Sequence, residues 1–377
     1  MKMNVAVEDG KACCGCGACS YVCSKRAITM RYDDEGFLYP VVEKDLCISC
    51  GCCINVCAYR TNIEMPKRGV SKVFGVKHCD SSIRAKSRSG GVFVAISDVV
   101  LEKGGIVYGA VLETPYHVKH IRATDRASRD LMCGSKYVES DINNILPLIE
   151  SDLSTGKTVL FSGTPCQSEA IARLFRKKYA NLILCDFICH GVPSQKLWSD
   201  YLKWAKRKYN DEVSAVDFRD KSMHSWSSHV EKIILSKRVV YSRRYANLFN
   251  ANQCLRPSCY ICPYATPIRS SDFSLGDFWG IGNVNPSFND EKGVSLLMLR
   301  TKVAEELFLE IKDTLETFET TMDRIKHYNL KRPTSRPIDR EAFWTDYRKH
   351  GFGYVSRKYG GYDFLRKIKM KLVDHID

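Results

Sequence analysis

The chain has 377 residues, of which 44% are hydrophobic, and a formal net charge of +14 at pH 7. This length is enough for about two or three domains with a sizeable core. It contains no apolar run of about eighteen residues and no secretory or transit signal, so we expect a cytoplasmic protein without a membrane span. Thiols stay reduced in the cytoplasm, and the 18 cysteines are therefore expected to be metal ligands or catalytic groups rather than disulfides.

Two cysteine runs with the same spacing lie near the N-terminus. Each follows C-x2-C-x2-C-x3-C, and residues 11–60 resemble the bacterial two-cluster ferredoxins over both runs. Residues 28–32 and 37–42 flank a DDEG turn between the runs and predict a β-hairpin. The resemblance implies that the fourth cysteine of each run binds the other cluster. One 4Fe-4S cluster then takes Cys13, Cys16, Cys19 and Cys57, and the other takes Cys47, Cys50, Cys53 and Cys23.

A pair of zinc knuckles is the alternative, because four thiolates also suit tetrahedral zinc. A zinc site does not need the third x2 step, which favours iron–sulfur clusters. Ser24 and Ala58 stand where such ferredoxins usually have proline, which weakens the helix-start signal but removes no ligand. Cys14 and Cys52 are left over inside the loops, either as neighbours of the ligands or as small residues.

Beyond the ferredoxin-like segment, 1–65, the pattern changes to alternating helices and strands. A linker is expected over 61–72, which contains Pro66 and little periodicity. The alternation predicts an α/β domain with a mixed or parallel sheet over 73–300. Helices are expected over 90–105 and 168–175, and strands over 106–112, 157–163 and 181–189.

The C-terminal part, residues 301–377, is expected to be a helical, basic extension. Apolar residues at helical spacing predict an amphipathic helix over 302–321. The N-terminal 65 residues are close to neutral, so most of the positive charge lies beyond them. A basic surface favours acidic partners, although such a run is usually a solvated face.

Seven strings occur in order along the α/β domain: SRSGGVF, GSKYVES, LFSGTPCQ, CHGVPS, FRDK, LRPSCYICPY and SLGDFWG. Together they resemble the beta subunit of the coenzyme F420 hydrogenases and dehydrogenases, in the bacterial form with an N-terminal ferredoxin domain. The resemblance covers about residues 74–300. It implies a flavoprotein that binds FAD and passes electrons between the flavin and an iron–sulfur cluster.

Seven residues are expected at the flavin phosphates or ring. Three of them precede an apolar helix, whose N-terminus favours a phosphate, and three follow a strand, where open α/β sheets bind ligands. The alternatives are a linker end, a surface lysine and a turn in which Thr164 caps a helix. The residues are Ser89, Gly90, Gly91, Lys136, Gly163, Thr164 and Gln167.

Four further cysteines lie within the same strings and are expected to hold a third 4Fe-4S cluster near the flavin. They are Cys166, Cys189, Cys259 and Cys262. Cys166 and Cys189 follow successive strands and would emerge at one edge of the sheet. Cys166 as a nucleophile and small buried cysteines are the alternatives. Cys79, Cys133, Cys185 and Cys254 are expected to be buried, with Cys185 or Cys254 as possible replacements for a ligand.

Two functions follow from these motifs. In the first, ferredoxin-type clusters pass electrons to a flavin that reduces an organic substrate; in the second, the chain is an electron-transfer subunit that serves a partner oxidoreductase. The expected partners are an acidic donor such as ferredoxin, coenzyme F420, or a phosphorylated or nucleotide-linked substrate. No nucleic-acid motif and no nicotinamide fingerprint is present. His224 and His229 are candidates for a substrate pocket, but no catalytic residue is assigned.

Overall fold

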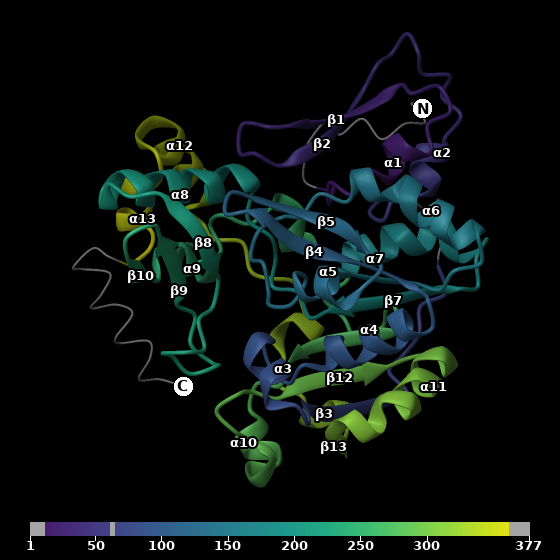
Figure 1. Cartoon of the computed structure of the whole chain (residues 1–377). Coiled ribbons are helices and arrows are strands. Elements are labelled where there is room, and N and C mark those ends of the chain that lie inside the picture. The colour runs from purple at the N-terminus through teal and green to yellow at the C-terminus, as the bar shows by residue number, and fades with distance from the viewer. Residues whose placement is uncertain (1–11, 61–64, 362–377) are drawn as a thin grey trace.

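The structure, a computed structural model, describes residues 12–60 and 65–361 (Figure 1). Predictions that fall on residues 1–11, 61–64 and 362–377, including part of the linker and the end of the basic extension, lie outside the described residues. Among the described helices, none is long and apolar enough to cross a membrane.

The ferredoxin module, residues 12–60, repeats its backbone conformation as well as its sequence. Helices α1 (Ala18–Tyr21) and α2 (Cys52–Asn55) begin after Gly17 and Gly51, whose φ angles of 71° and 77° suit glycine. The expected hairpin is confirmed, because β1 (Ile28–Tyr32) and β2 (Leu38–Val42) pair in antiparallel register. The module (purple) lies at one edge of the molecule in Figure 1.

An eight-stranded sheet forms the centre of the remaining chain and confirms the expected mixed sheet. Its strand order is β13-β3-β12-β11-β7-β6-β4-β5. The four strands β11, β7, β6 and β4 are parallel to one another, and the other pairings are antiparallel. The bounds are β3 (Lys72–His78), β4 (Ile106–Thr114), β5 (His117–Ala123), β6 (Val159–Gly163), β7 (Leu182–Phe187), β11 (Phe273–Asp277), β12 (Ser295–Leu299) and β13 (Leu315–Thr320).

Helices cover both faces of this sheet. Since successive side chains of a strand point to opposite faces, neighbouring residues of one strand pack in different cores. Leu160 and Ile183 pack with α4 and α11 on one face, whereas Phe161 and Leu184 pack with α6 and α7 on the other. Ala18 of the ferredoxin module belongs to this second core. The bounds are α3 (Ser81–Lys86), α4 (Val92–Glu102), α5 (Arg126–Asp130), α6 (Leu146–Ser154), α7 (Pro165–Ile171), α10 (Ile281–Val284) and α11 (Lys302–Ile311).

A smaller sheet, in the order β10-β9-β8, and four helices form another core beside the large sheet. Phe37 of the ferredoxin hairpin and Val118 of β5 belong to this core, so it contacts both other parts. The bounds are β8 (Val213–Asp217), β9 (Glu231–Leu235), β10 (Val239–Ser242), α8 (Gln195–Tyr209), α9 (Arg244–Asn250), α12 (Arg340–His350) and α13 (Phe352–Lys358).

The helix expected over 302–321 is wrong in its second half. Helix α11 ends at Ile311, and residues 315–320 form β13, which pairs with β3 at the edge of the large sheet. Threonine and phenylalanine favour a strand here, and the Phe318 ring lies against Gly75 of β3, where a Cβ atom would meet it at 2.1 Å. The domain boundaries at residues 65, 73 and 300 remain a prediction.

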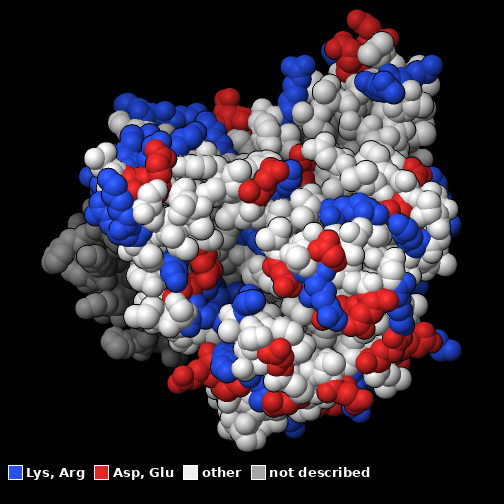
Figure 2. All heavy atoms as spheres, in the orientation of Figure 1, with Lys and Arg blue, Asp and Glu red and all other residues white. Residues whose placement is uncertain are grey.

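Positive charge is unevenly distributed on the face seen in Figure 2. Lysine and arginine gather over α8, while basic and acidic side chains alternate over the large sheet. Lys203, Lys206 and Arg207 are exposed members of this group. An acidic partner remains a prediction.

Candidate cofactor-binding site

The ferredoxin module brings cysteines of both runs together. Cys57, from the second run, lies near Cys13, Cys16 and Cys19 of the first. Burial raises the pKa of Cys57 to about 11, and the nearby Cys16 and Cys13 add to the effect. The structure therefore groups the four residues expected at one cluster, although three of them are far from Cys57 in sequence.

The second expected set lies closer to the surface. Cys53 is buried and shares a small core with Ile28 and Cys23, whereas Cys50 is exposed. The Cys23 sulfur accepts a hydrogen bond from the Ala27 amide at 3.3 Å. Of the two sets, this one faces the solvent.

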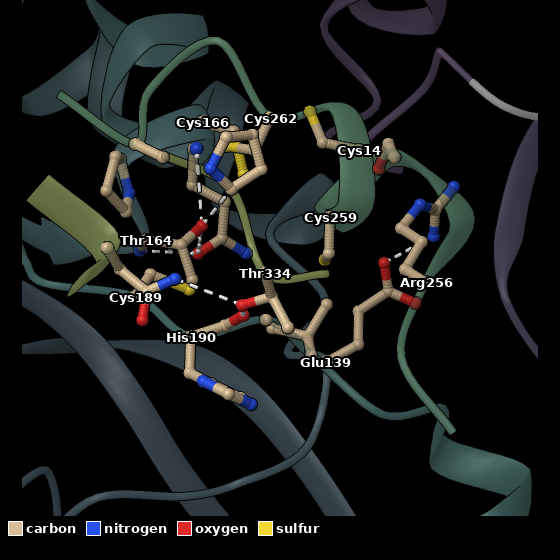
Figure 3. A pocket seen from close by; sticks show the side chains of 18 of the residues that line it. Cys14, Glu139, Thr164, Cys166, Cys189, His190, Arg256, Cys259, Cys262 and Thr334 are labelled. Carbon is tan, nitrogen blue, oxygen red and sulfur yellow. Dashed lines mark hydrogen bonds and ion pairs between the residues drawn. The ribbon is translucent and has the colours of Figure 1, made fainter. Parts of the chain in front are cut away.

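Five cysteines line one small cavity of about 40 Å³, which we call the thiol pocket (Figure 3). Cys166 lies in the first turn of α7, directly after β6, and Cys189 follows β7. Cys259 lies in a 3-10 helix, Pro257–Ile261, and Cys262 follows it. The structure thus brings together all four cysteines expected at a third cluster. The fifth, Cys14, comes from the ferredoxin module.

The remaining cysteines lie elsewhere. Cys185 and Cys254 are fully buried in two different apolar cores and do not line the thiol pocket, so neither replaces a ligand there. Cys133 is half-buried. The expectation that Cys79 is buried is wrong: it follows the last residue of β3 and is exposed.

The thiols of the pocket surround a space rather than converge on a point. Within residues 12–60 and 65–361, no three His, Cys, Asp or Glu side chains are close enough to hold a single metal ion. Four cysteine thiolates facing one cavity are a suitable donor set for a 4Fe-4S cluster. The fifth thiol exceeds what such a cluster needs.

The walls of the thiol pocket come from both parts of the chain. The ferredoxin module contributes Cys14 and Tyr59, and the Tyr59 side chain is hydrogen-bonded to Cys262. In return, Arg256 reaches into the module, where its Nε donates to the Cys13 carbonyl and its Nη2 to the Leu38 carbonyl, both at 2.5 Å. The pocket therefore lies at the interface between the two parts.

A second cavity, of about 670 Å³, adjoins the thiol pocket and lies over the ends of β6, β7 and β11. The two share Thr164, Gln167 and Cys189 as lining residues. A volume of this size is typical of sites for small molecules and cofactors. Six of the seven expected flavin residues line it: Ser89, Gly91, Lys136, Gly163, Thr164 and Gln167.

Gly90 is the exception, because its role is in packing. Its amide donates to Ser295 Oγ at 2.8 Å, and a Cβ atom at this position would lie 2.0 Å from the Val76 carbonyl. Gly90 thus allows α4 to begin close to the sheet, while Gly91, with a φ of 86°, turns the chain into the helix.

Thr164 and Gln167 also fulfil the simpler alternative. They form a capping box at the start of α7, in which each side chain bonds the backbone of the other residue. Gln167 Nε2 further donates to the Ser140 carbonyl at 2.9 Å. Their positions are therefore fixed by the strand-to-helix turn, which presents them to both cavities.

Lys136 lies in the wall of the large cavity with its ammonium group held by backbone. Its Nζ donates to the carbonyls of Leu131 and Cys133, both at 2.9 Å. Burial lowers the pKa of Lys136 to about 8. An ammonium has three donors, so one is left for an anion in the cavity.

Charged residues that the sequence did not single out also line the large cavity. Arg219 Nη1 lies 3.1 Å from Asp277 Oδ2 and 3.0 Å from the Tyr137 hydroxyl. Arg88 lines the same wall. Arg88, Arg219 and Asp277 lie within three of the seven family-like strings, SRSGGVF, FRDK and SLGDFWG. These strings were the sequence signal that could have identified them. His229 also lines the cavity, and burial together with the positive Arg219 and Arg88 lowers its pKa to about 3, so it is neutral at pH 7.

Two family models match the chain. Residues 156–323 match the model for the C terminus of the coenzyme F420 hydrogenase/dehydrogenase beta subunit, and residues 12–61 match a 4Fe-4S dicluster domain. Among solved structures, the chain is similar to one chain of the xenon-derivatized F420-reducing [NiFe] hydrogenase complex from Methanosarcina barkeri. The identity is 20%, the match covers 70% of this chain and 87% of that chain, and the TM-score is 0.48. No curated protein sequence matches. The chain is therefore similar to the coenzyme F420 hydrogenase/dehydrogenase beta subunits over residues 156–323, and it carries a 4Fe-4S dicluster domain over residues 12–61.

Proposed function

We propose that the chain is an iron–sulfur flavoprotein oxidoreductase with two 4Fe-4S clusters in the ferredoxin module, a third in the thiol pocket and FAD in the large cavity. When bound, the clusters supply one-electron transfer and the flavin supplies hydride transfer to an organic substrate. The observation that carries this proposal is the shared wall between the thiol pocket and the large cavity. It supports the proposal because four cysteines suited to a cluster line one side of this wall and a cavity of about 670 Å³ lies on the other.

The residues of the large cavity would orient and neutralise an anionic cofactor. The N-terminus of α4 presents backbone amides near Ser89 and Gly91, where a phosphate is favoured. Lys136 offers a positive charge in the same cavity. Beyond them, Arg88 and Arg219 favour a phosphorylated or nucleotide-linked substrate, or F420 as the electron partner.

Anaerobic purification with quantification of metal, sulfide and flavin tests this function. We expect about twelve irons and twelve sulfides per chain, corresponding to three 4Fe-4S clusters, together with one FAD released by denaturation. Zinc in place of iron would contradict the clusters. Fully loaded iron with no releasable flavin would contradict the enzyme and leave the electron-transfer subunit as the function.

The charge of Lys136 is expected to control flavin binding. Because the protonated side chain attracts a phosphate and its pKa is about 8, flavin affinity should be highest below pH 8 and fall as the pH rises above it. We expect Lys136→Gln to weaken binding about tenfold at pH 7, the effect of roughly 1.4 kcal/mol, and to abolish this pH dependence.

Flavin fluorescence titrations of the apoprotein between about pH 6.5 and pH 9.5 measure this effect. Lys103→Gln is the matched control, because Lys103 is exposed at the other end of α4 and pairs with Glu310. Equal affinity and equal pH dependence in the two variants would show that Lys136 does not face the cofactor.

A further inference from the structure

Cys14 lies between two groups of cysteines that we assign to different clusters. Its thiol is within hydrogen-bonding reach of two sulfurs, that of Cys16 in the first set of the ferredoxin module and that of Cys166 in the thiol pocket, and its single S–H proton can be donated to one of them at a time. A thiol that neither cluster requires therefore touches an expected ligand of each. Figure 3 shows Cys14 among the labelled side chains around the thiol pocket.

The loop that carries Cys14 is fixed in place from the α/β side. Gly15 has a φ of 70°, and a Cβ atom there would lie 2.9 Å from Arg256 Nη1 and 3.0 Å from Glu139 Oε1. The Arg256 side chain also binds the Cys13 carbonyl. The positions on both sides of Cys14 are thus held against the other part of the chain.

Tyr59 makes a second contact of the same kind. It comes two residues after Cys57, and its side chain donates a hydrogen bond to Cys262 of the thiol pocket. The Tyr59 ring packs edge-to-face against Tyr264, whose hydroxyl donates to the Ala58 carbonyl. Both contacts therefore start beside expected ligands of the first set.

The second cysteine run offers an internal comparison. The position equivalent to Cys14 is Ile48, which is exposed. The other spare thiol, Cys52, is hydrogen-bonded to Cys50 and is also exposed. Cys14 lines the thiol pocket beside the α/β part, whereas its equivalent Ile48 is exposed. The duplicated module is therefore asymmetric at this interface.

We propose that Cys14 and Tyr59 are positioning residues of the thiol-pocket cluster, which donate hydrogen bonds from the ferredoxin module to two of its ligands and set its reduction potential. This inference rests on the proposed function. A donor at a ligand sulfur stabilises the reduced state, which carries more negative charge, and the effect is larger in a buried site. The potential of this cluster is thereby coupled to the docking of the ferredoxin module.

The test compares Cys14→Ala, Cys14→Ser, Tyr59→Phe and Cys52→Ala in the full-length, anaerobically purified chain. Iron content and redox titration followed by electron paramagnetic resonance are the measurements. We expect every variant to keep about twelve irons, because no cluster ligand is removed. In Cys14→Ala the reduction equilibrium of the thiol-pocket cluster should shift about tenfold toward the oxidised state, or about 59 mV to more negative potential for one electron.

The other variants separate a hydrogen-bond effect from a structural one. Tyr59→Phe should shift the same cluster in the same direction, Cys14→Ser keeps a donor and should lie closer to the wild type, and Cys52→Ala should leave this cluster unchanged. Loss of about four irons in both Cys14 variants would make Cys14 a ligand and overturn the proposal. A potential equal to that of Cys52→Ala in both Cys14→Ala and Tyr59→Phe would also overturn it.

Failure of the proposed function would look different. In that case the wild-type chain itself would hold only two clusters, or zinc in the thiol pocket, before any variant is made. A wild-type chain with three clusters and unshifted variants would instead reject the inference alone.

Discussion

Replacing Cys57 with alanine is expected to remove about four irons and to empty the cluster of the first cysteine run rather than that of its own run. The reason is spatial, because Cys57 lies beside Cys13, Cys16 and Cys19 in the folded module. The cluster attributed to Cys47, Cys50 and Cys53 should keep its iron and its spectroscopic signal.

Double variants distinguish this crossed arrangement from an uncrossed one. Cys19→Ala combined with Cys57→Ala should lose no more iron than either single change, because both residues belong to one site. Cys53→Ala combined with Cys57→Ala should lose about eight irons, because two sites are affected. Iron and sulfide content, measured anaerobically, gives the answer. The reverse pattern of additivity would assign each cluster to a single run.

Local patterns were sufficient to predict the elements that surround the site. The repeated cysteine spacing, the DDEG turn and the alternation of helices and strands gave a hairpin and a mixed sheet, both confirmed. Cys166 and Cys189 were expected at one edge of the sheet because each follows a parallel strand, and both line the thiol pocket. Such inferences need only the period of a strand and the direction of its neighbours.

Features that depend on contacts between distant segments were not predictable in the same way. Residues 315–320 read as the end of a helix, and only pairing with β3, far back in the chain, makes them a strand. The cysteine spacing assigns Cys14 no ligand role, because the run is complete without it. Its contact with Cys166 depends on docking of the ferredoxin module, which no spacing within either segment encodes.

A chain that lacks residues 1–65 would also lack Cys14 and Tyr59 from the pocket wall, so we do not expect truncation to leave the third site intact.

Arg256 is the residue on which this docking depends most. Its guanidinium is fully buried, forms an ion pair with Glu139 and donates to the carbonyls of Cys13 and Leu38. Burial raises the pKa of Glu139 to about 7 in spite of the arginine beside it. The same residue begins the 3-10 helix that carries Cys259, so one side chain joins both groups of cysteines.

Arg256→Met is therefore expected to destabilise the chain by about 3–5 kcal/mol, the usual cost of leaving one partner of a buried ion pair alone. It should also lower iron retention in the thiol pocket. Glu139→Gln should cost less, because the amide still accepts a hydrogen bond, and the double variant should be less destabilised than the sum of the two single changes. Arg336→Met is the control, since Arg336 is exposed and pairs with an exposed Glu341. Urea unfolding of the anaerobic holoprotein measures the difference. If Arg256→Met were no less stable than Arg336→Met, the buried ion pair would not hold the ferredoxin module in place, and the pocket at the interface would need another support.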